Sequence, residues 1–327
     1  MVLSLLFAGT PEVAVPSLRA LAEDHEHFDV KAVLTRPDAP TGRGRKLMPS
    51  AVKKAALELG LPVLECNPSD EDSCIASLKA TGAEAAAVVA YGKILRQNVL
   101  DALPLGWYNL HFSLLPQWRG AAPVQRAIWA GDDITGATVF RITRGMDCGP
   151  ILSQMTTSIG EHETSGDLLT RLSHDGASLL AASLQGMYSG SIVPVEQDQS
   201  AFELADKITV EDAHIRFDAP AFAVDRQIRA CTPNPGAWCI MREDSKNEEN
   251  STTLHVLKSA IADSNNVNTP KSGQLSPGEL FVGKHNVWVG TATEALELIE
   301  VKAQGKKAMK AADWARGARL SAAAYCA

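Results

Sequence analysis

An amide and an imidazole stand two residues apart in the apolar stretch "WYNLHF", at Asn109 and His111. In a strand, residues i and i+2 share a face, so both side chains would enter one cleft. An Asn amide can donate to a developing oxyanion, and a protonated His can assist it. The competing interpretation is a satisfied, partly buried His with an Asn neighbour, which is the commoner reason for an isolated pair of this kind.

A carboxylate in the later segment "RGMDCGPI" adds a third group with a chemical role. Gly145 and Gly149 flank Asp147 closely, and they permit unusual backbone angles and close ligand approach. Asp147 could orient His111 and accept a proton. Together with Asn109, these residues predict an acyl-transfer site that works without a protein nucleophile.

The segment that follows the Asn-His pair contains Ser113, Leu114, Leu115 and Pro116, which can present backbone N–H and C=O groups to a flat heterocycle. Ser113 lacks the G-x-S-x-G elbow of a serine nucleophile, so a covalent role is disfavoured. The first strand-to-helix turn, "FAGTPEVA", has one glycine and does not match G-x-G-x-x-G. A dinucleotide site is therefore disfavoured as well.

The elements that must position these residues alternate between strand and helix. This alternation predicts a parallel sheet with helices on both faces. Ligands of such sheets gather at the carboxyl ends of the strands, where Asn109 and His111 fall. The expected strands are 2–8, 28–35, 62–65, 84–91, 136–143 and 150–159, and the expected helices are 12–22, 51–59, 70–80, 121–130 and 165–187.

The pattern changes near residue 206, after a stretch rich in Ser, Gln and acidic residues. Short strand-like runs separated by Gly, Pro, Asn and Ser follow a helical segment at 220–230, and they predict a small β-rich domain of barrel type. We therefore expect a first domain over 1–190, a linker over 191–206 and a second domain over 207–327.

Charge and cysteine content exclude some classes of protein. The net charge is −7, but the segments 36–54 and 302–319 each carry +5, which is compatible either with docking a polyanion or with two solvated faces. The six cysteines form no C-x-x-C pair, so we expect reduced, mostly buried thiols and no zinc site. No apolar run reaches the length of about 18 residues that a membrane span needs.

Several segments together resemble one enzyme family. "NLHFSLLPQWRGAAPVQRAIWAGD" and "GMDCGPIL" are similar to the 10-formyl-tetrahydrofolate-dependent formyltransferases. "FAGTPEVA", "GRGRKLMPSAVK", "VVAYGKIL", "NPGAW" and "QGKKAMKAADWARGARL" resemble, in the same order, segments of the family members that act on tRNA. The resemblance runs from about residue 3 to about residue 320.

The resemblance implies an α/β fold, with a Rossmann-like formyltransferase domain on a parallel sheet and a C-terminal β-barrel domain of OB-like type. It implies formylation of the α-amino group of methionine on initiator tRNA, with 10-formyl-tetrahydrofolate as formyl donor and no metal. Asn109, His111 and Asp147 would be catalytic, and Ser113, Leu114, Leu115 and Pro116 would bind the folate. The expected tRNA contacts are Arg43, Arg45 and Lys46 in the loop 36–50, and Lys306, Lys307 and Lys310 near the C-terminus.

Three other functions share some of these features. A formylfolate transferase acting on an amino-sugar nucleotide or another small amine would need the same trio but no basic loop. A hydrolase releasing formate from formylfolate would also keep the trio. A non-catalytic RNA-binding protein would keep the basic segments. The basic segments favour tRNA among the enzymes, and we expect a cytoplasmic monomer without a membrane partner.

Overall fold

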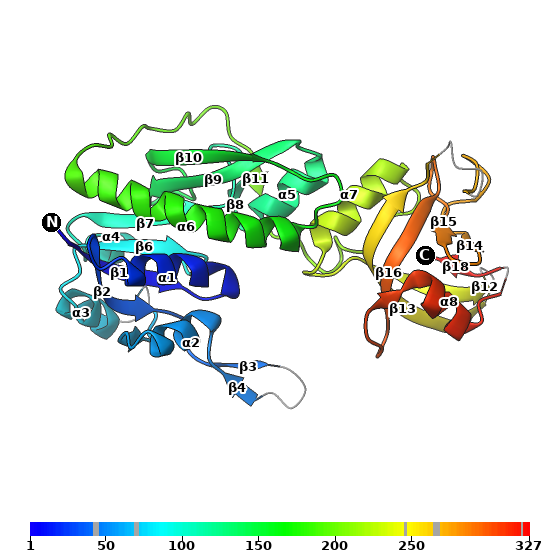
Figure 1. The fold of residues 1–327 in the computed structure, drawn as a ribbon, viewed down its shortest axis with the longest axis horizontal. Helices are drawn as coiled ribbons and strands as arrows, with labels where there is room; N and C mark the ends of the chain where they lie inside the picture. Colours follow the sequence, from blue (N-terminus) through cyan, green and yellow to red (C-terminus); the bar gives the residue numbers. More distant parts are fainter. Residues whose placement is uncertain (42–45, 69–71, 245–246, 264–268, 322) are drawn as a thin grey trace. The chain divides into compact units, whose positions relative to one another are not determined.

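The computed structural model describes residues 1–327 except 42–45, 69–71, 245–246, 264–268 and 322. The chain forms two compact units (Figure 1). The first unit contains Met1–Pro123, Ile134–Ser158 and Leu169–Ala205, and the second contains Val124–Asp133, Ile159–Leu168 and Asp206–Ala327. Residues 191–205, for which we expected a linker, are thus part of the first unit.

A seven-stranded sheet in the order β10-β9-β7-β6-β1-β2-β5 forms the centre of the first unit. The five strands from β7 to β5 are parallel, as the alternation of elements predicted, whereas β9 and β10 extend the sheet in antiparallel fashion. The bounds are β1 Leu3–Gly9, β2 Phe28–Leu34, β5 Val63–Leu64, β6 Ala85–Val89, β7 Gly106–His111, β9 Ile134–Arg141 and β10 Ile151–Ser158.

Helices cover both faces of this sheet. Trp107 of β7 lies in one buried cluster with residues of α3 and α4, such as Leu78 and Val99. Leu110 lies on the opposite face, where it packs against Gly176 of α6. The helices of this unit are α1 Val15–Glu23 after the short η1 Glu12–Ala14, α2 Ala51–Glu58, α3 Asp72–Ala80, α4 Gln97–Leu100 and most of α6 Ser165–Ser189.

Short elements outside the pattern complete the first unit. The strands β3 Ala39–Thr41 and β4 Lys46–Met48 pair as a hairpin within the expected basic loop (Figure 1). The strands β8 Arg119–Gly120 and β11 Leu204–Ala205 pair in parallel. This pairing joins the end of the expected linker to the residues that follow β7.

The second unit is built on an antiparallel sheet in the order β14-β15-β16-β13-β12-β18, with β17 paired to β16. A bridge between Glu279 and Tyr325 brings the two edges together, so the sheet forms the nearly closed barrel that the sequence predicted. The elements are α5 Pro123–Ala130, α7 Ala221–Cys231, β12 Trp238–Asp244, β13 Asn247–Ile261, β14 Leu280–Val282, β15 Val287–Val289, β16 Leu296–Ala303, β17 Met309–Lys310, α8 Ala311–Ala318 and β18 Tyr325–Cys326.

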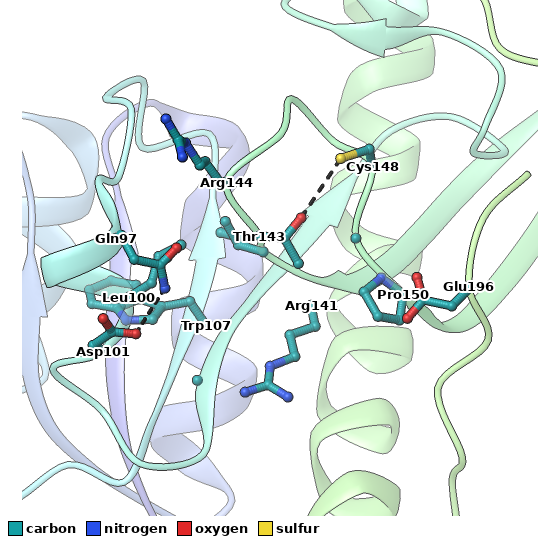
Figure 2. A pocket seen from close by; sticks show the side chains of 13 residues that line it. Gln97, Leu100, Asp101, Trp107, Arg141, Thr143, Arg144, Cys148, Pro150 and Glu196 are labelled. Carbon is teal, nitrogen blue, oxygen red and sulfur yellow. Dashed lines mark hydrogen bonds between the residues drawn. The ribbon is translucent and has the colours of Figure 1, made fainter. Parts of the chain in front are cut away.

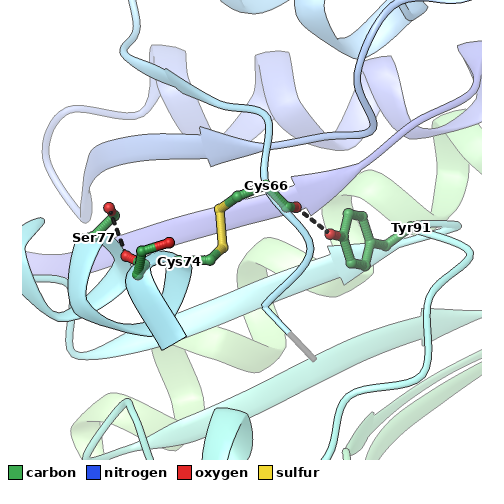
Figure 3. Close-up of a disulfide and its surroundings, with 5 residues drawn as sticks. Cys66, Cys74, Ser77 and Tyr91 are labelled. Atoms are coloured by element: carbon green, nitrogen blue, oxygen red, sulfur yellow. Dashed lines mark hydrogen bonds between the residues drawn. A yellow bond between two sulfur atoms is a disulfide. The ribbon is translucent and has the colours of Figure 1, made fainter. Parts of the chain in front are cut away.

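The expectation of six reduced thiols is wrong for one pair. Cys66 and Cys74 form a disulfide between the segment after β5 and the first turn of α3 (Figure 3). Their Cα atoms lie 5.7 Å apart, a separation that a disulfide spans readily. The Cys66 carbonyl also accepts a hydrogen bond from the Tyr91 hydroxyl. The spacing of eight residues has no recognised disulfide pattern, so the sequence did not reveal the pair.

In the part of the chain that the structure describes, no helix is both long enough and apolar enough to cross a membrane.

Candidate active site

The pair Asn109 and His111 lies at the carboxyl end of β7, as predicted. The strand runs between β6 and β9, and Asn109 is paired with Val88 on one side and Phe140 on the other. Alternation along the strand places both polar side chains on the same face as Trp107. His111 is 6% exposed and Asn109 is partly buried. The strand therefore presents an amide and a buried imidazole side by side.

The imidazole of His111 is oriented by the backbone that follows β7. Its Nε2 lies 2.8 Å from the carbonyl oxygen of Trp118. Because a carbonyl oxygen only accepts, Nε2 carries the hydrogen and donates it. The ring also packs edge-on against Phe140, with ring centroids 6.4 Å apart. Nδ1 is consequently the ring nitrogen left to gain or lose a proton.

Asp147 faces that second nitrogen from the loop between β9 and β10. Its Oδ2 lies 3.8 Å from Nδ1 of His111 and accepts a hydrogen bond of 2.9 Å from the Gly120 N–H. Asp147 has a φ of +46°, in the left-handed region that non-glycine residues seldom adopt. Gly149, two residues on, lies so close to the Arg141 carbonyl that a Cβ would stand 1.9 Å from its oxygen.

Burial also affects the charge of the imidazole. Burial lowers the pKa of His111 below its ordinary value, while the Asp147 carboxylate and the bond to the Trp118 carbonyl raise this pKa in part. The net direction is downward, so the neutral ring is favoured near pH 7. The protonated His111 that the sequence analysis considered is therefore disfavoured in the protein without its substrates.

These three residues carry functional groups that acyl transfer without a covalent enzyme intermediate can use. An amide donor and an imidazole that faces a carboxylate can supply an oxyanion contact and a proton acceptor.

Family models match both parts of the chain: the model described as formyl transferase matches residues 2–184, and the model described as formyl transferase, C-terminal domain, matches residues 207–319. The chain belongs to the formyl transferase family.

Curated relatives match this formyl transferase along its whole length. A protein of Bifidobacterium adolescentis named methionyl-tRNA formyltransferase is 69% identical over 99% of both chains. A protein of Streptomyces coelicolor with the same name is 50% identical over 98% of both chains. The similarity therefore covers both units.

Solved structures share the fold at much lower identity. A sugar 3N-formyl transferase, WlaRD, matches with a TM-score of 0.61 and 17% identity over 94% of this chain and 100% of its own. HypX from Aquifex aeolicus in complex with tetrahydrofolic acid matches with a TM-score of 0.62 and 14% identity over 95% of this chain and 46% of its own. At these identities the likeness concerns the fold alone.

The segment Ser113–Pro116 of the formyl transferase is a fixed turn after β7. Thr138 and Gln154 hold its backbone: the Thr138 hydroxyl bonds the Ser113 carbonyl and the Leu115 N–H, and the Gln154 amide donates to the Leu115 carbonyl. Ser113 is fully buried, and its hydroxyl donates to the Gln117 carbonyl. Leu114 and Pro116 remain partly exposed. Backbone groups of Ser113 and Leu115 are thus already hydrogen-bonded within the protein. What the segment presents to a ligand is mainly the apolar surface of Leu114 and Pro116.

The expected tRNA contacts lie in both units. Arg43 and Arg45 are outside the described residues, while Lys46 opens β4 with an exposed side chain. Lys306, Lys307 and Lys310 of the second unit are also exposed, on the segment between β16 and α8. The exposure of these four lysines allows contact with a polyanion.

Sequence reasoning missed residues that surround the Asp147 loop. Arg119, Gln197 and Gln199 lie beside this loop, and the first two are buried. Arg119 falls inside the quoted motif segment "PQWRG", but nothing in that motif shows which side chain it holds. Gln197 and Gln199 fall in the stretch expected to be a linker. Among the described residues, no group of three or more His, Cys, Asp or Glu side chains is placed to hold a metal.

Proposed function

We propose that this formyl transferase moves the formyl group of 10-formyl-tetrahydrofolate to the α-amino group of methionine on initiator tRNA. The observation that carries the proposal is the 69% identity, over 99% of both chains, to a protein named methionyl-tRNA formyltransferase. The site supports it with an amide, a buried imidazole and a facing carboxylate at the end of β7. These groups can stabilise an oxyanion and take up a proton during transfer of an acyl group to an amine.

Asn109 is proposed to stabilise charge on the formyl oxygen. The attacking α-amino group is a competent nucleophile near neutral pH, because such groups titrate at about 8. As the new N–C bond forms, negative charge grows on the formyl oxygen. An amide donor fixed in advance stabilises that charge without reorganisation, and removing one such donor typically lowers the rate about 10²–10³-fold.

The His111–Asp147 pair is proposed to carry the proton. The neutral imidazole has its Nε2–H bonded to Trp118, so Nδ1 accepts the proton that the amine loses on attack. The resulting cation faces the Asp147 carboxylate at 3.8 Å, which stabilises it. The pair then returns the proton to the folate nitrogen as the C–N bond to the formyl group breaks. A proton-transfer role of this kind contributes about 10²–10⁴-fold.

The residues beside this pair suit a folate donor. Leu114 and Pro116 offer partly exposed apolar surface in the turn that follows β7, and Thr138 and Gln154 hold this turn. A rigid apolar wall with one polar contact is typical of sites for flat heterocycles. We propose that Ser113 to Pro116 bind the donor in this way, with Ser113 acting only through its place in the turn.

The basic segments are proposed to bind the tRNA. Lys46 in the first unit, and Lys306, Lys307 and Lys310 in the second, carry exposed ammonium groups suited to phosphates. Arg43 and Arg45 belong to the same proposal.

The protein would act as a monomer in the cytoplasm, where aminoacylated tRNA is found. Light scattering during size-exclusion chromatography would measure its mass.

The direct test is a formyl-transfer assay with methionyl initiator tRNA and 10-formyl-tetrahydrofolate, with uncharged tRNA as control. Formyl-methionine formed only on the charged tRNA is the expected result. Formylation of an amino-sugar nucleotide, or release of formate without transfer, would overturn the tRNA proposal while keeping the site. Binding of tRNA without any turnover of the donor would overturn the catalytic proposal.

A further inference from the structure

The loop that carries Asp147 is not held in place by packing alone. Asp147 has a left-handed backbone, and glycines stand two residues away on each side. A cavity of about 310 Å³ lies beside the loop and is lined by Cys148 and Gly149, together with side chains such as Arg141 and Glu196 (Figure 2). A loop next to a cavity lacks contacts on that side, so other interactions must fix the carboxylate.

Two glutamine side chains supply these interactions. The Gln197 Nε2 donates to the carbonyl oxygens of Asp147, at 2.9 Å, and Gly149, at 2.7 Å. The Gln199 Nε2 donates to the Cys148 carbonyl at 3.3 Å. Three consecutive carbonyls of the loop therefore accept from amides of one segment. Gln197 is 6% exposed, which protects its two bonds from competition by water.

A buried guanidinium sets the orientation of both amides. Arg119, which is 4% exposed, donates to the Gln197 Oε1 from Nε at 3.0 Å and from Nη2 at 2.7 Å. Its Nη1 donates to the Gln199 Oε1 at 3.1 Å. Since an arginine only donates, the oxygen of each amide must face it and the NH₂ group must face the loop. The network is thus satisfied in one arrangement.

The two residues next to Arg119 in the sequence hold the His111 imidazole and the Asp147 carboxylate through their backbone groups. The residue before it, Trp118, accepts from Nε2 of His111 through its carbonyl. The residue after it, Gly120, donates its N–H to Oδ2 of Asp147. One three-residue stretch therefore holds the imidazole and the carboxylate directly, and through Gln197 it holds the loop behind the carboxylate.

We infer that Gln197, oriented by Arg119, is a positioning residue that keeps the Asp147 carboxylate facing His111 during formyl transfer. The inference rests on the proposed function, because it deepens the role given there to the His111–Asp147 pair. Losing the two donors of Gln197 frees the loop to move toward the cavity. A displacement of about 1 Å in such a site can lower the rate by about 10².

Two substitutions of Gln197 distinguish the hydrogen bonds that its amide donates from the packing of its side chain. Gln197→Met keeps the length of the side chain but removes every polar contact. Gln197→Glu keeps an oxygen for Arg119, retains the fold through that ion pair, and removes the donors to Asp147 and Gly149. Gln185→Met, on the exposed surface of α6, is the matched control. We expect both Gln197 variants to lower kcat about 10–100-fold with little change in the KM for tRNA, and the control to match the wild type.

A second readout does not depend on activity. Asp147 is the charged group that raises the pKa of His111 against burial, so a displaced carboxylate lets this pKa fall further. NMR titration of the His111 imidazole should show a lower pKa in both Gln197 variants, shifted toward the value in Asp147→Asn. If the wild-type protein transferred no formyl group, the proposed function would be rejected. A lower pKa of His111 in the Gln197 variants would in that case still support the positioning role of Gln197. Wild-type kcat and titration in Gln197→Glu would overturn the positioning role, whether or not Gln197→Met folds.

Discussion

The carboxylate oxygen Oδ2 of Asp147 lies 3.8 Å from Nδ1 of His111 while the Gly120 N–H holds the same oxygen at 2.9 Å. The separation is longer than a hydrogen bond, so the two groups interact through charge when Nδ1 gains a proton. Because burial lowers the pKa of His111, the neutral ring is favoured near pH 7, and in the proposed mechanism it accepts the proton that the attacking amine loses.

Replacing Asp147 with asparagine should remove the charge that stabilises a protonated His111 while leaving the fold intact. An amide can still accept from Gly120 through its oxygen, but it carries no charge to stabilise a protonated His111. We expect single-turnover formyl transfer to fall about 10²–10⁴-fold, with the melting temperature close to that of the wild type. A variant that folds normally and keeps near-normal kcat would remove Asp147 from the mechanism.

The lowered pKa of His111 predicts a loss of stability in mild acid. The folded-state pKa lies below the unfolded value, so its contribution is fully present above the unfolded pKa, about 6.5, and is lost as the pH falls through the folded value. The free energy of unfolding of the wild type should therefore decrease between pH 8 and pH 5.5 by more than that of His111→Gln. Urea unfolding of both proteins at the two pH values measures this, and equal decreases would contradict the direction of the shift.

The sequence predicted that Asn109 and His111 lie in a strand of the sheet and share one of its faces. Alternation along β7 was sufficient, because Trp107 on the same face joins the core under α3 and α4 while Leu110 packs against α6. The position of both residues at the carboxyl end of a parallel strand followed from the alternation of strands and helices. These features depend on local patterns, which a single sequence contains.

The support of Asp147 depends on contacts that no local pattern contains. Gln197 reaches its carbonyl across 50 residues of sequence, from a stretch whose Ser, Gln and acidic residues are typical of a linker. The strand β11 that anchors this stretch has two residues, too few to show an alternation. The charge state of His111 could not be predicted from the sequence either. It depends on whether burial lowers the pKa of His111 more than the Asp147 carboxylate raises it.

A substitution of Asn109 distinguishes its proposed contact with the oxyanion from the proton transfer proposed for the His111–Asp147 pair. Asn109→Ala removes the amide donor but leaves the His111–Asp147 geometry, since His111 is oriented by Trp118. We expect kcat to fall about 10²–10³-fold while the NMR-determined pKa of His111 stays close to the wild-type value. A large change in that pKa would mean that Asn109 acts by holding the imidazole.

The exposed lysines of the second unit should affect tRNA binding and leave the chemical step unchanged. Removing one lysine–phosphate interaction should reduce the slope of log binding constant against log salt by about 0.7–0.9, because fewer counterions are released. A triple variant with Lys306→Glu, Lys307→Glu and Lys310→Glu should raise the KM for tRNA on the order of tenfold or more, with kcat at saturation unchanged. Lys271→Glu, an exposed charge reversal outside this segment, is the control. If the triple variant and the control gave the same KM and the same salt slope, these lysines would not bind the tRNA, and recognition would have to rest on the first unit.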